Sequence, residues 1–315
     1  MKKIQSRKNV WVAGVICLGL LFSSSEALPW GFATHAYIDD HLGKKGTLNN
    51  LGEIYGGVMP DLFNTLFEYP EYLDFLPNQT HLRSMKVWKA SRGKVEKSLA
   101  FGFVSHNNRW GADFTAHHTC QTCGERAGYA YVKAAVLLSE YPLPSELGIP
   151  DEIAIEIFHE IVENAVDILV KRTDPLVGDQ LSSAAEQRSP RFPQLLVRAY
   201  ARRFASFAQI TELEAAQFIE TAESEFRDAI DSYGQILLLD EADAISAISE
   251  QTASLAQGFL ALYGIVLSIP PDQVVAMVAD YMDLAIGLCQ GDYLQEIEAT
   301  IPYVRHKLRI HGVTY

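Results

Sequence analysis

Possible metal ligands are concentrated in one short stretch of this chain. Residues 103–118, FVSHNNRWGADFTAHH, hold three of the nine histidines together with an aspartate. On one continuous helix, Asp113 and His117 would share a face because they are four residues apart, and His106 would lie two turns earlier on nearly the same side. Imidazole and carboxylate groups that converge in this way are typical of zinc sites, whereas Ca²⁺ and Mg²⁺ sites consist mostly of oxygen ligands.

A second pair of possible ligands lies further along the chain. His159 and Glu163 are also four residues apart, in the segment HEIVE, and Glu156 and Glu160 lie beside them. The pattern is not the His-Glu-x-x-His motif of zinc proteases, because Glu163 takes the place of the second histidine. The spacing predicts a second bidentate pair on one helix face.

Three further candidates precede these pairs, namely His35 in WGFATH, Asp61 in GGVMPD and His81 in NQTH. Taken in order, WGFATH, GGVMPDLF, QTH, FGFVSH…GADFTAHH and HEIVE together resemble the zinc-dependent phospholipase C family. The resemblance is closest to the catalytic domain of glycosylphosphatidylinositol-specific phospholipase D and covers roughly residues 30–170. The zinc-dependent single-strand nucleases belong to the same superfamily and share the Trp-Gly-x-x-x-His opening.

This resemblance implies a compact helical bundle with three zinc ions at the bottom of a cleft. It implies that Asp113 bridges two ions and that Asp61 either binds a metal or orients the attacking water. The implied ligands are His81 and His106 for one site, His35 and the main chain of Trp30 for the next, and His117, His159 and Glu163 for the third.

The central histidine segment departs from the family pattern in two ways. Six residues separate His106 from Asp113, where relatives usually have three, so we expect that the helix can bulge or break between them. His117 and His118 are adjacent and would point about 100° apart on a helix. One of the two is therefore expected to be the ligand, and the four-residue spacing to Asp113 favours His117.

The first 29 residues predict a cleavable signal peptide. A basic start is followed by the apolar run 10–22, which is shorter than the about 20 residues needed to span a bilayer. Cleavage after Ala27 would leave Leu-Pro before Trp30, whose nitrogen would then be an amide and a poor zinc ligand, whereas cleavage or trimming to Trp30 would expose its amine. We expect a secreted or periplasmic protein.

The expected chemistry is hydrolysis of a phosphodiester. Two zinc ions about 4 Å apart can share a hydroxide, because zinc lowers the pKa of bound water towards ~7. We expect this metal-bridging hydroxide to attack a phospholipid head group, with the third zinc stabilising the departing alkoxide. Two alternatives stay open: a single-strand nuclease or nucleotidase of the same superfamily, and a non-catalytic helical binding protein that a metal stabilises.

Charge bears on the expected partner. The formal net charge is −13, and removal of residues 1–29 makes it about −16. A field of this sign repels polyanions, so we expect no stable nucleic-acid binding, but a phospholipid or other small phosphodiester and transient contact with a membrane surface. Phe63, Phe67 and Tyr69 are interleaved with carboxylates and are candidates for binding a quaternary ammonium group. The alternative is that these aromatic side chains pack an irregular loop.

Helical periodicity dominates the elements that must position these residues, and no stretch alternates as a strand for more than a few residues. A helix is predicted to start at Pro150-Asp151 and continue to Val170. Thr211 and Glu214 predict a capping box, and the prolines at the start of residues 270–288 are typical of a helix start. The sequence therefore predicts an all-α fold.

The domain organisation follows from composition. Residues 30–172 form the expected zinc-binding catalytic part, and residues 173–193, rich in Pro, Ser and charge, a connecting loop. Residues 194–315 are expected to be a C-terminal helical extension of the bundle, packed on the same domain. The apolar run 255–269 is too short for a membrane span and predicts a buried helix.

Three cysteines follow the predicted signal peptide. Cys120 and Cys123 could form a small disulfide in an oxidising compartment, with Cys289 free. Half of a zinc knuckle is the weaker interpretation, because no second pair follows.

Overall fold

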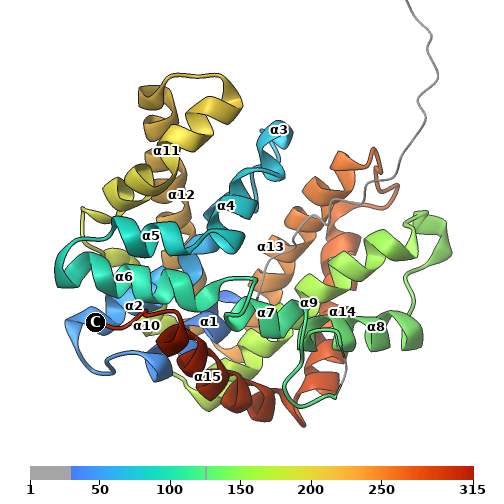
Figure 1. The fold of residues 1–315 in the computed structure, drawn as a ribbon. Coiled ribbons are helices and arrows are strands. Elements are labelled where there is room, and N and C mark those ends of the chain that lie inside the picture. Colours follow the sequence, from blue (N-terminus) through green and yellow to red (C-terminus); the bar gives the residue numbers. More distant parts are fainter. Residues whose placement is uncertain (1–29, 125) are drawn as a thin grey trace, which may run out of the picture.

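Helices form the regular structure of this protein, as the sequence predicts, and no strand occurs in the part that the structure describes (Figure 1). The computed structural model describes residues 30–124 and 126–315, so the expected signal peptide at 1–29 lies outside it. The first elements are α1 (Phe32–Leu42), α2 (Leu48–Val58), η1 (Met59–Phe63), α3 (Pro70–Leu73), α4 (Leu76–Leu82), α5 (Met85–Ala90), α6 (Gly93–His106) and α7 (Ala112–His117). They are followed by α8 (Tyr129–Glu140), η2 (Ser145–Leu147), α9 (Asp151–Thr173), α10 (Val177–Glu186), α11 (Phe192–Ala208), α12 (Glu212–Leu238), α13 (Glu241–Leu262), α14 (Pro271–Cys289) and α15 (Tyr293–Ile310).

Helix α9 runs through the middle of the bundle and carries the second predicted ligand pair. It begins after Pro150, as predicted, and every residue from 161 to 170 is buried. Helices α1, α8, α13 and α14 pack around it. A helix buried on all sides belongs to the core, so its polar side chains require specific partners.

The pairing of α2 with α6 fixes the start of the central histidine segment. The two backbones approach so closely that a Cβ at Gly56 would overlap the carbonyl oxygen of Leu99, and one at Gly102 would overlap that of Glu53. Glycine alone permits this approach. The contact holds the C-terminal end of α6, and therefore His106, beside the end of α2.

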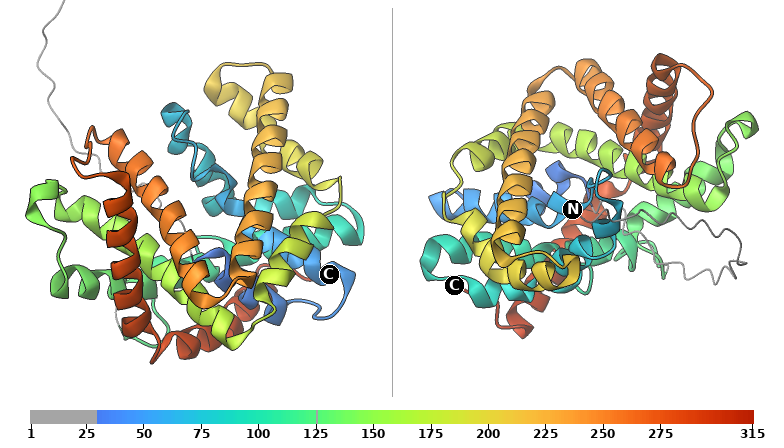
Figure 2. Two further views of the ribbon diagram at one scale, coloured as in Figure 1. Left: turned by 180° about the vertical axis from the view of Figure 1, so that it is seen from behind. Right: turned by 90° about the horizontal axis from the view of Figure 1, so that it is seen from above.

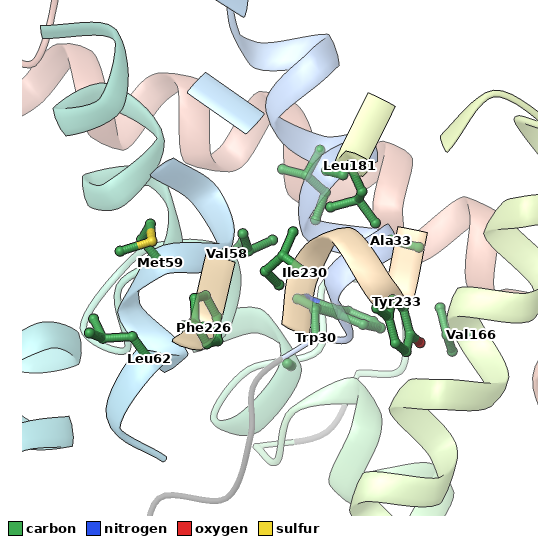
Figure 3. Close-up of a cluster of buried hydrophobic side chains, with 14 of the residues drawn as sticks. Trp30, Ala33, Val58, Met59, Leu62, Val166, Leu181, Phe226, Ile230 and Tyr233 are labelled. Atoms are coloured by element: carbon green, nitrogen blue, oxygen red, sulfur yellow. The ribbon is translucent and has the colours of Figure 1, made fainter. Parts of the chain in front are cut away.

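The C-terminal helices share one core with the N-terminal ones. Phe226, Ile230 and Tyr233 of α12 pack beside Trp30, Ala33, Val58, Met59 and Leu62 (Figure 3). The predicted capping box is present, because the Thr211 hydroxyl accepts the Glu214 backbone N–H and the Glu214 side chain accepts the Thr211 N–H. Residues 194–315 thus form part of the structure that surrounds the predicted ligands.

The prediction of a connecting loop at 173–193 is wrong for the middle of this segment, where α10 (Val177–Glu186) forms. This helix buries Val177, Leu181, Ala184 and Ala185, which lie on one face. Gly178 resembles a helix breaker in the sequence, but in the structure it is the site of closest approach to α12, since a Cβ there would overlap the carbonyl oxygen of Gly234. The packing against α12 outweighs the loop-like composition.

The predicted buried helix at 255–269 is correct only for its first half, where residues 255–262 belong to α13 and Leu260 is buried. Helix α13 ends at Leu262, and residues 263–269 form an irregular, largely exposed connection in which Val266 is 86% exposed. Gly264, with a φ of +70°, lies just past the helix end and favours its termination. Within residues 30–315 no single helix is long and apolar enough to cross a membrane, and only α14 and α15 together, bent by 70°, satisfy that test.

Candidate metal centre

Eight of the predicted ligand side chains meet in three groups that could each hold a metal ion. Within each group the candidate ligand atoms lie within 4.8 Å of one another, and every residue is buried. We refer to the eight side chains together as the metal cluster. The groups are His35, His106 and Asp113; Asp61, His81 and His106; and His117, His159 and Glu163.

The group around Asp61 has fixed imidazole tautomers. His81 Nδ1 lies 2.9 Å from the Pro77 carbonyl oxygen, and His106 Nδ1 lies 2.7 Å from that of Gly57. A carbonyl oxygen only accepts, so both Nδ1 atoms carry hydrogen and both Nε2 atoms present lone pairs. These Nε2 atoms lie 3.1 Å and 3.5 Å from Asp61 Oδ1, which suits a shared cation.

The group around His35 contains an imidazole that nothing else in the described structure satisfies. His35 is fully buried, and neither of its ring nitrogens has a hydrogen-bond partner. Its ring stacks on His106 with 4.0 Å between the centroids. A buried polar group without a partner is costly, so this side chain fits a metal ligand better than a core residue.

The third group joins α7 to α9. His117 Nε2 lies 3.2 Å and His159 Nε2 2.7 Å from Glu163 Oε1. His117 Nδ1 lies 3.2 Å from Asp113 Oδ1, so this group adjoins the first one. Tyr131 of α8 stacks on the His159 ring at 4.5 Å and restricts its orientation.

Burial controls the electrostatics of the metal cluster. It lowers the pKa of His35 and of His159 to about 3, so both imidazoles are neutral and can donate lone pairs. Burial also raises the pKa of Asp61 to about 6 and that of Glu163 well above its usual range. Asp61 Oδ2 and Glu163 Oε2 have no hydrogen-bond donor among the described residues. Neutral imidazoles beside unsatisfied carboxylate oxygens fit a buried divalent cation such as zinc.

The helix breaks between His106 and Asp113, which is one of the two outcomes expected from the sequence. Both residues nevertheless reach the same group. Asn107 Oδ1 accepts the backbone N–H groups of Arg109 and Trp110, and this turn separates α6 from α7. The extra residues fold back on themselves and keep both ligands in place. The helix spacing alone could not predict this.

The structure distinguishes between the two adjacent histidines. His117 is buried and belongs to the third group, whereas His118 is exposed and belongs to none. Of the two histidines, the one at the four-residue spacing from Asp113 is therefore the one that faces a possible metal site. His118 provides a neighbouring residue of the same type outside the metal cluster.

Asp61 lies in a group that could hold a metal, which is one of the two roles that the resemblance implied for it. Asp61 groups with His81 and His106, while Asp113 groups with His35 and His106, so His106 is common to both. The Trp30 side chain is buried, and its indole N–H donates to Thr115 Oγ1 at 3.1 Å. Trp30 also lines a cavity together with Asp61 and Glu163.

Two adjoining cavities lie beside the metal cluster. The one that reaches Trp30, Asp61 and Glu163 has a volume of about 370 Å³. The other, of about 310 Å³, lies between the α3 region and α13 and is lined by apolar side chains such as Phe67 and Phe259. Both are lined by Thr65, Glu160, Thr252 and Leu255, so they form one cleft.

The three aromatic residues that the sequence suggests for binding a quaternary ammonium group have different surroundings in the structure. Phe67 lines the cleft, but Phe63 is fully buried among core side chains and is not available to a substrate. The Tyr69 ring packs on Tyr72 and Phe218 and does not line the cleft. The assignment of Phe63 to substrate binding is thus wrong, because its ring is part of the core, as the alternative interpretation held.

Asp167 was missed by sequence analysis, and Glu160 was assigned no role. Asp167 lies one turn after Glu163 on α9 and anchors α1, since its carboxylate accepts the backbone N–H groups of Ala33 and Thr34 at 2.8 Å. Glu160 lines both cavities, and burial raises its pKa to about 7. The four-residue repeat that links His159, Glu163 and Asp167 was the available signal for Asp167.

In the described structure the predicted disulfide is present, and the half zinc knuckle is not. Cys120 and Cys123 form a disulfide in the connection after α7, and Cys289 is a buried free thiol. The backbone N–H groups of Gln121 and Thr122 donate to Glu296 of α15 at 2.7 Å and 2.8 Å. The disulfide therefore stabilises a connection that is also anchored to the C-terminal helix.

Comparison with models of known families, with curated proteins and with solved structures finds no match to this chain. The family resemblance therefore remains a prediction from the motifs.

Proposed function

We propose that this protein is a secreted zinc-dependent phosphodiesterase of the phospholipase C type, which hydrolyses phospholipid head groups. The observation that carries the proposal is the metal cluster, in which eight buried side chains from six helical elements converge beside a cleft. The ring nitrogens of His35 and the outer carboxylate oxygens of Asp61 and Glu163 are buried without a hydrogen-bond partner in the described structure, which is costly unless a cation compensates them.

Zinc is the metal that suits this set of ligands. The groups contain five histidines and three carboxylates in total, which matches the nitrogen and oxygen preference of zinc. When bound, zinc lowers the pKa of water and neutralises charge on a phosphodiester. Up to three ions are expected, one for each group.

The residues of the chain would bind and orient the substrate around this centre. His81 and His106 have their Nε2 atoms directed at Asp61 by hydrogen bonds to backbone carbonyls, so the ligands are preorganised. The cavity beside Asp61 and Glu163 can receive the phosphodiester. The apolar cavity that adjoins it can exclude water and receive the less polar part of the substrate.

The lining of the cleft favours a phospholipid over a nucleic acid. Asp74, Glu156 and Glu160 line the apolar cavity, and none of its lining residues is Lys or Arg. Carboxylates repel the successive phosphates of a polynucleotide, whereas a single phosphodiester next to bound cations avoids this repulsion. This observation makes a nuclease the less favoured alternative.

Metal analysis combined with a substrate panel tests the proposal. The purified protein should contain two or three zinc ions per chain and hydrolyse phosphatidylcholine but not single-stranded DNA, and a chelator should abolish hydrolysis. His117→Ala should lose zinc and activity, while His118→Ala, an exposed neighbour outside the metal cluster, should retain both. Fewer than two zinc ions with no chelator-sensitive hydrolysis of a phosphodiester would instead indicate a metal-stabilised binding protein.

A further inference from the structure

Exposed apolar side chains gather in three connections between helices. Segments 64–75, 207–214 and 262–272 contain half of the large hydrophobic side chains that are exposed in the described residues. We call these segments the three tips. Their exposed members are Tyr69 (42%), Phe207 (46%), Leu213 (67%), Leu262 (41%), Tyr263 (51%) and Val266 (86%). Single exposed hydrophobic residues are ordinary, but a gathered set marks an interaction surface.

The three tips project from the same side of the bundle. Figure 1 and the left view of Figure 2 both show α3, the α11–α12 connection and the α13–α14 connection at the top of the molecule. The first tip lies between the other two, because Phe75 stacks on Phe207 at 4.0 Å and Phe67 packs against Gly258 of α13. The three tips therefore lie side by side along one side of the bundle.

The first and third tips border the cleft. The apolar cavity is lined by Phe67 and Leu73 from the first tip and by Leu262 and Tyr263 from the third. Through Thr65 and Glu160 it continues to the cavity beside the metal cluster. A molecule that enters from the side of the tips thus has a continuous path to the metal ligands.

The charge of the tips is uniform. Together the three segments contain six carboxylates and no Lys or Arg: Glu68, Glu71, Asp74, Glu212, Glu214 and Asp272. An anionic lipid layer would be repelled by these groups. In a zwitterionic layer the outermost group is the ammonium of the head group, which complements them.

We propose that the three tips form a docking surface for a zwitterionic lipid layer. This inference rests on the proposed function, since it specifies how a phospholipid in a membrane reaches the metal cluster. Separate apolar projections suit a fluid lipid layer, which moulds around each of them, whereas a protein partner requires a closely packed complementary surface. Aromatic side chains such as Tyr69 and Tyr263 suit the boundary between head groups and acyl chains.

Vesicle sedimentation of the full chain tests this surface. A chelator is present, so that binding is measured without hydrolysis. The protein should bind phosphatidylcholine vesicles more tightly than vesicles containing phosphatidylserine. Val266→Asp and Leu213→Asp should each weaken binding by about tenfold, because each removes an apolar side chain from the lipid contact.

Matched controls lie on the opposite side of the bundle. Leu176 and Leu239, in the α9–α10 and α12–α13 connections, are 63% and 45% exposed. Leu176→Asp and Leu239→Asp should leave vesicle binding unchanged. Circular dichroism of all four variants should match the wild type, because the substituted side chains are exposed.

Several results would overturn the docking surface. The first is that the Val266→Asp and Leu213→Asp variants both bind phosphatidylcholine vesicles as tightly as the wild type does. The second is that the wild type binds phosphatidylserine vesicles equally well or more tightly. The third is that the wild type forms a dimer that Val266→Asp dissociates. A monomeric short-chain phosphatidylcholine separates this proposal from the proposed function. Val266→Asp should hydrolyse it as the wild type does. If the wild type itself hydrolyses the monomer but does not bind vesicles, the docking surface alone is refuted. Vesicle binding without hydrolysis of any phosphodiester supports the surface and refutes the enzyme.

Discussion

Two buried carboxylates one turn apart on α9 have opposite surroundings. Asp167 is fully hydrogen-bonded, because the backbone N–H groups of Ala33 and Thr34 and the hydroxyls of Thr34 and Tyr233 donate to it at 2.7 to 2.9 Å. Glu163 faces His117 and His159, and its Oε2 has no hydrogen-bond donor in the described structure. Both side chains are inaccessible to solvent.

The difference separates a structural carboxylate from one that could bind a metal. Asp167 needs no cation because its donors compensate the charge. Its contacts fix the start of α1, where a Cβ at Gly31 would overlap the Asp167 carboxylate, and they thereby position His35 one turn later. Glu163 lacks such donors at Oε2, which is the arrangement expected of a side chain that could bind a metal.

The largest effect is expected for Glu163→Gln. Under the proposed function, this change should lower zinc-dependent hydrolysis by at least about 1,000-fold, because metal catalysis supplies several kcal/mol of the rate acceleration. Without metal, the free energy of unfolding should change by no more than about 1 kcal/mol, because burial already favours the neutral carboxyl. Activity assays and urea unfolding in a chelator measure the two quantities. A variant that binds as much zinc as the wild type would contradict the assignment.

Asp167→Asn should show the reverse pattern. An amide nitrogen in place of one carboxylate oxygen faces hydrogen-bond donors, so the free energy of unfolding should fall by about 2–4 kcal/mol with or without zinc. Urea unfolding in the presence and absence of a chelator measures this. A loss that occurs only in the presence of zinc would show that Asp167 belongs to the metal site.

The affinity for zinc should depend on pH through the carboxylates. Burial raises the pKa of Asp61 to about 6, so this group must lose a proton before it binds the metal, whereas His35 and His159, with pKa values of about 3, are already neutral. Affinity should therefore fall about tenfold through Asp61 alone when the pH is lowered from 7 to 5. Zinc titrations at several pH values measure this, and Asp61→Asn should remove that part of the dependence. An affinity that is constant over this range would refute the prediction.

The smallest effect is expected for Tyr233→Phe. The change removes the hydroxyl that donates to Asp167 at 2.9 Å and leaves the ring in the core. The free energy of unfolding should fall by about 1 kcal/mol, with the zinc content unchanged. Loss of zinc in this variant would mean that α12 supports the metal cluster directly.

Local patterns predicted much of this structure. The four-residue spacings of Asp113 with His117 and of His159 with Glu163 both place their side chains together, and the all-helical fold and the capping box at Thr211 are confirmed. The errors occurred where distant contacts overrode composition. Gly178 and its neighbours form a helix because α12 packs on them, and Phe63 is buried because a core surrounds it.

The sequence by itself determined which side chains can bind a metal and which of them share a helix face, because helix periodicity acts over a few residues. Only the tertiary structure decided that Asp61 joins His81 and His106, that His106 serves two groups across a broken helix, and that Asp167 anchors α1. These contacts join residues far apart in the chain. They depend on how whole helices pack, which no spacing within one helix specifies.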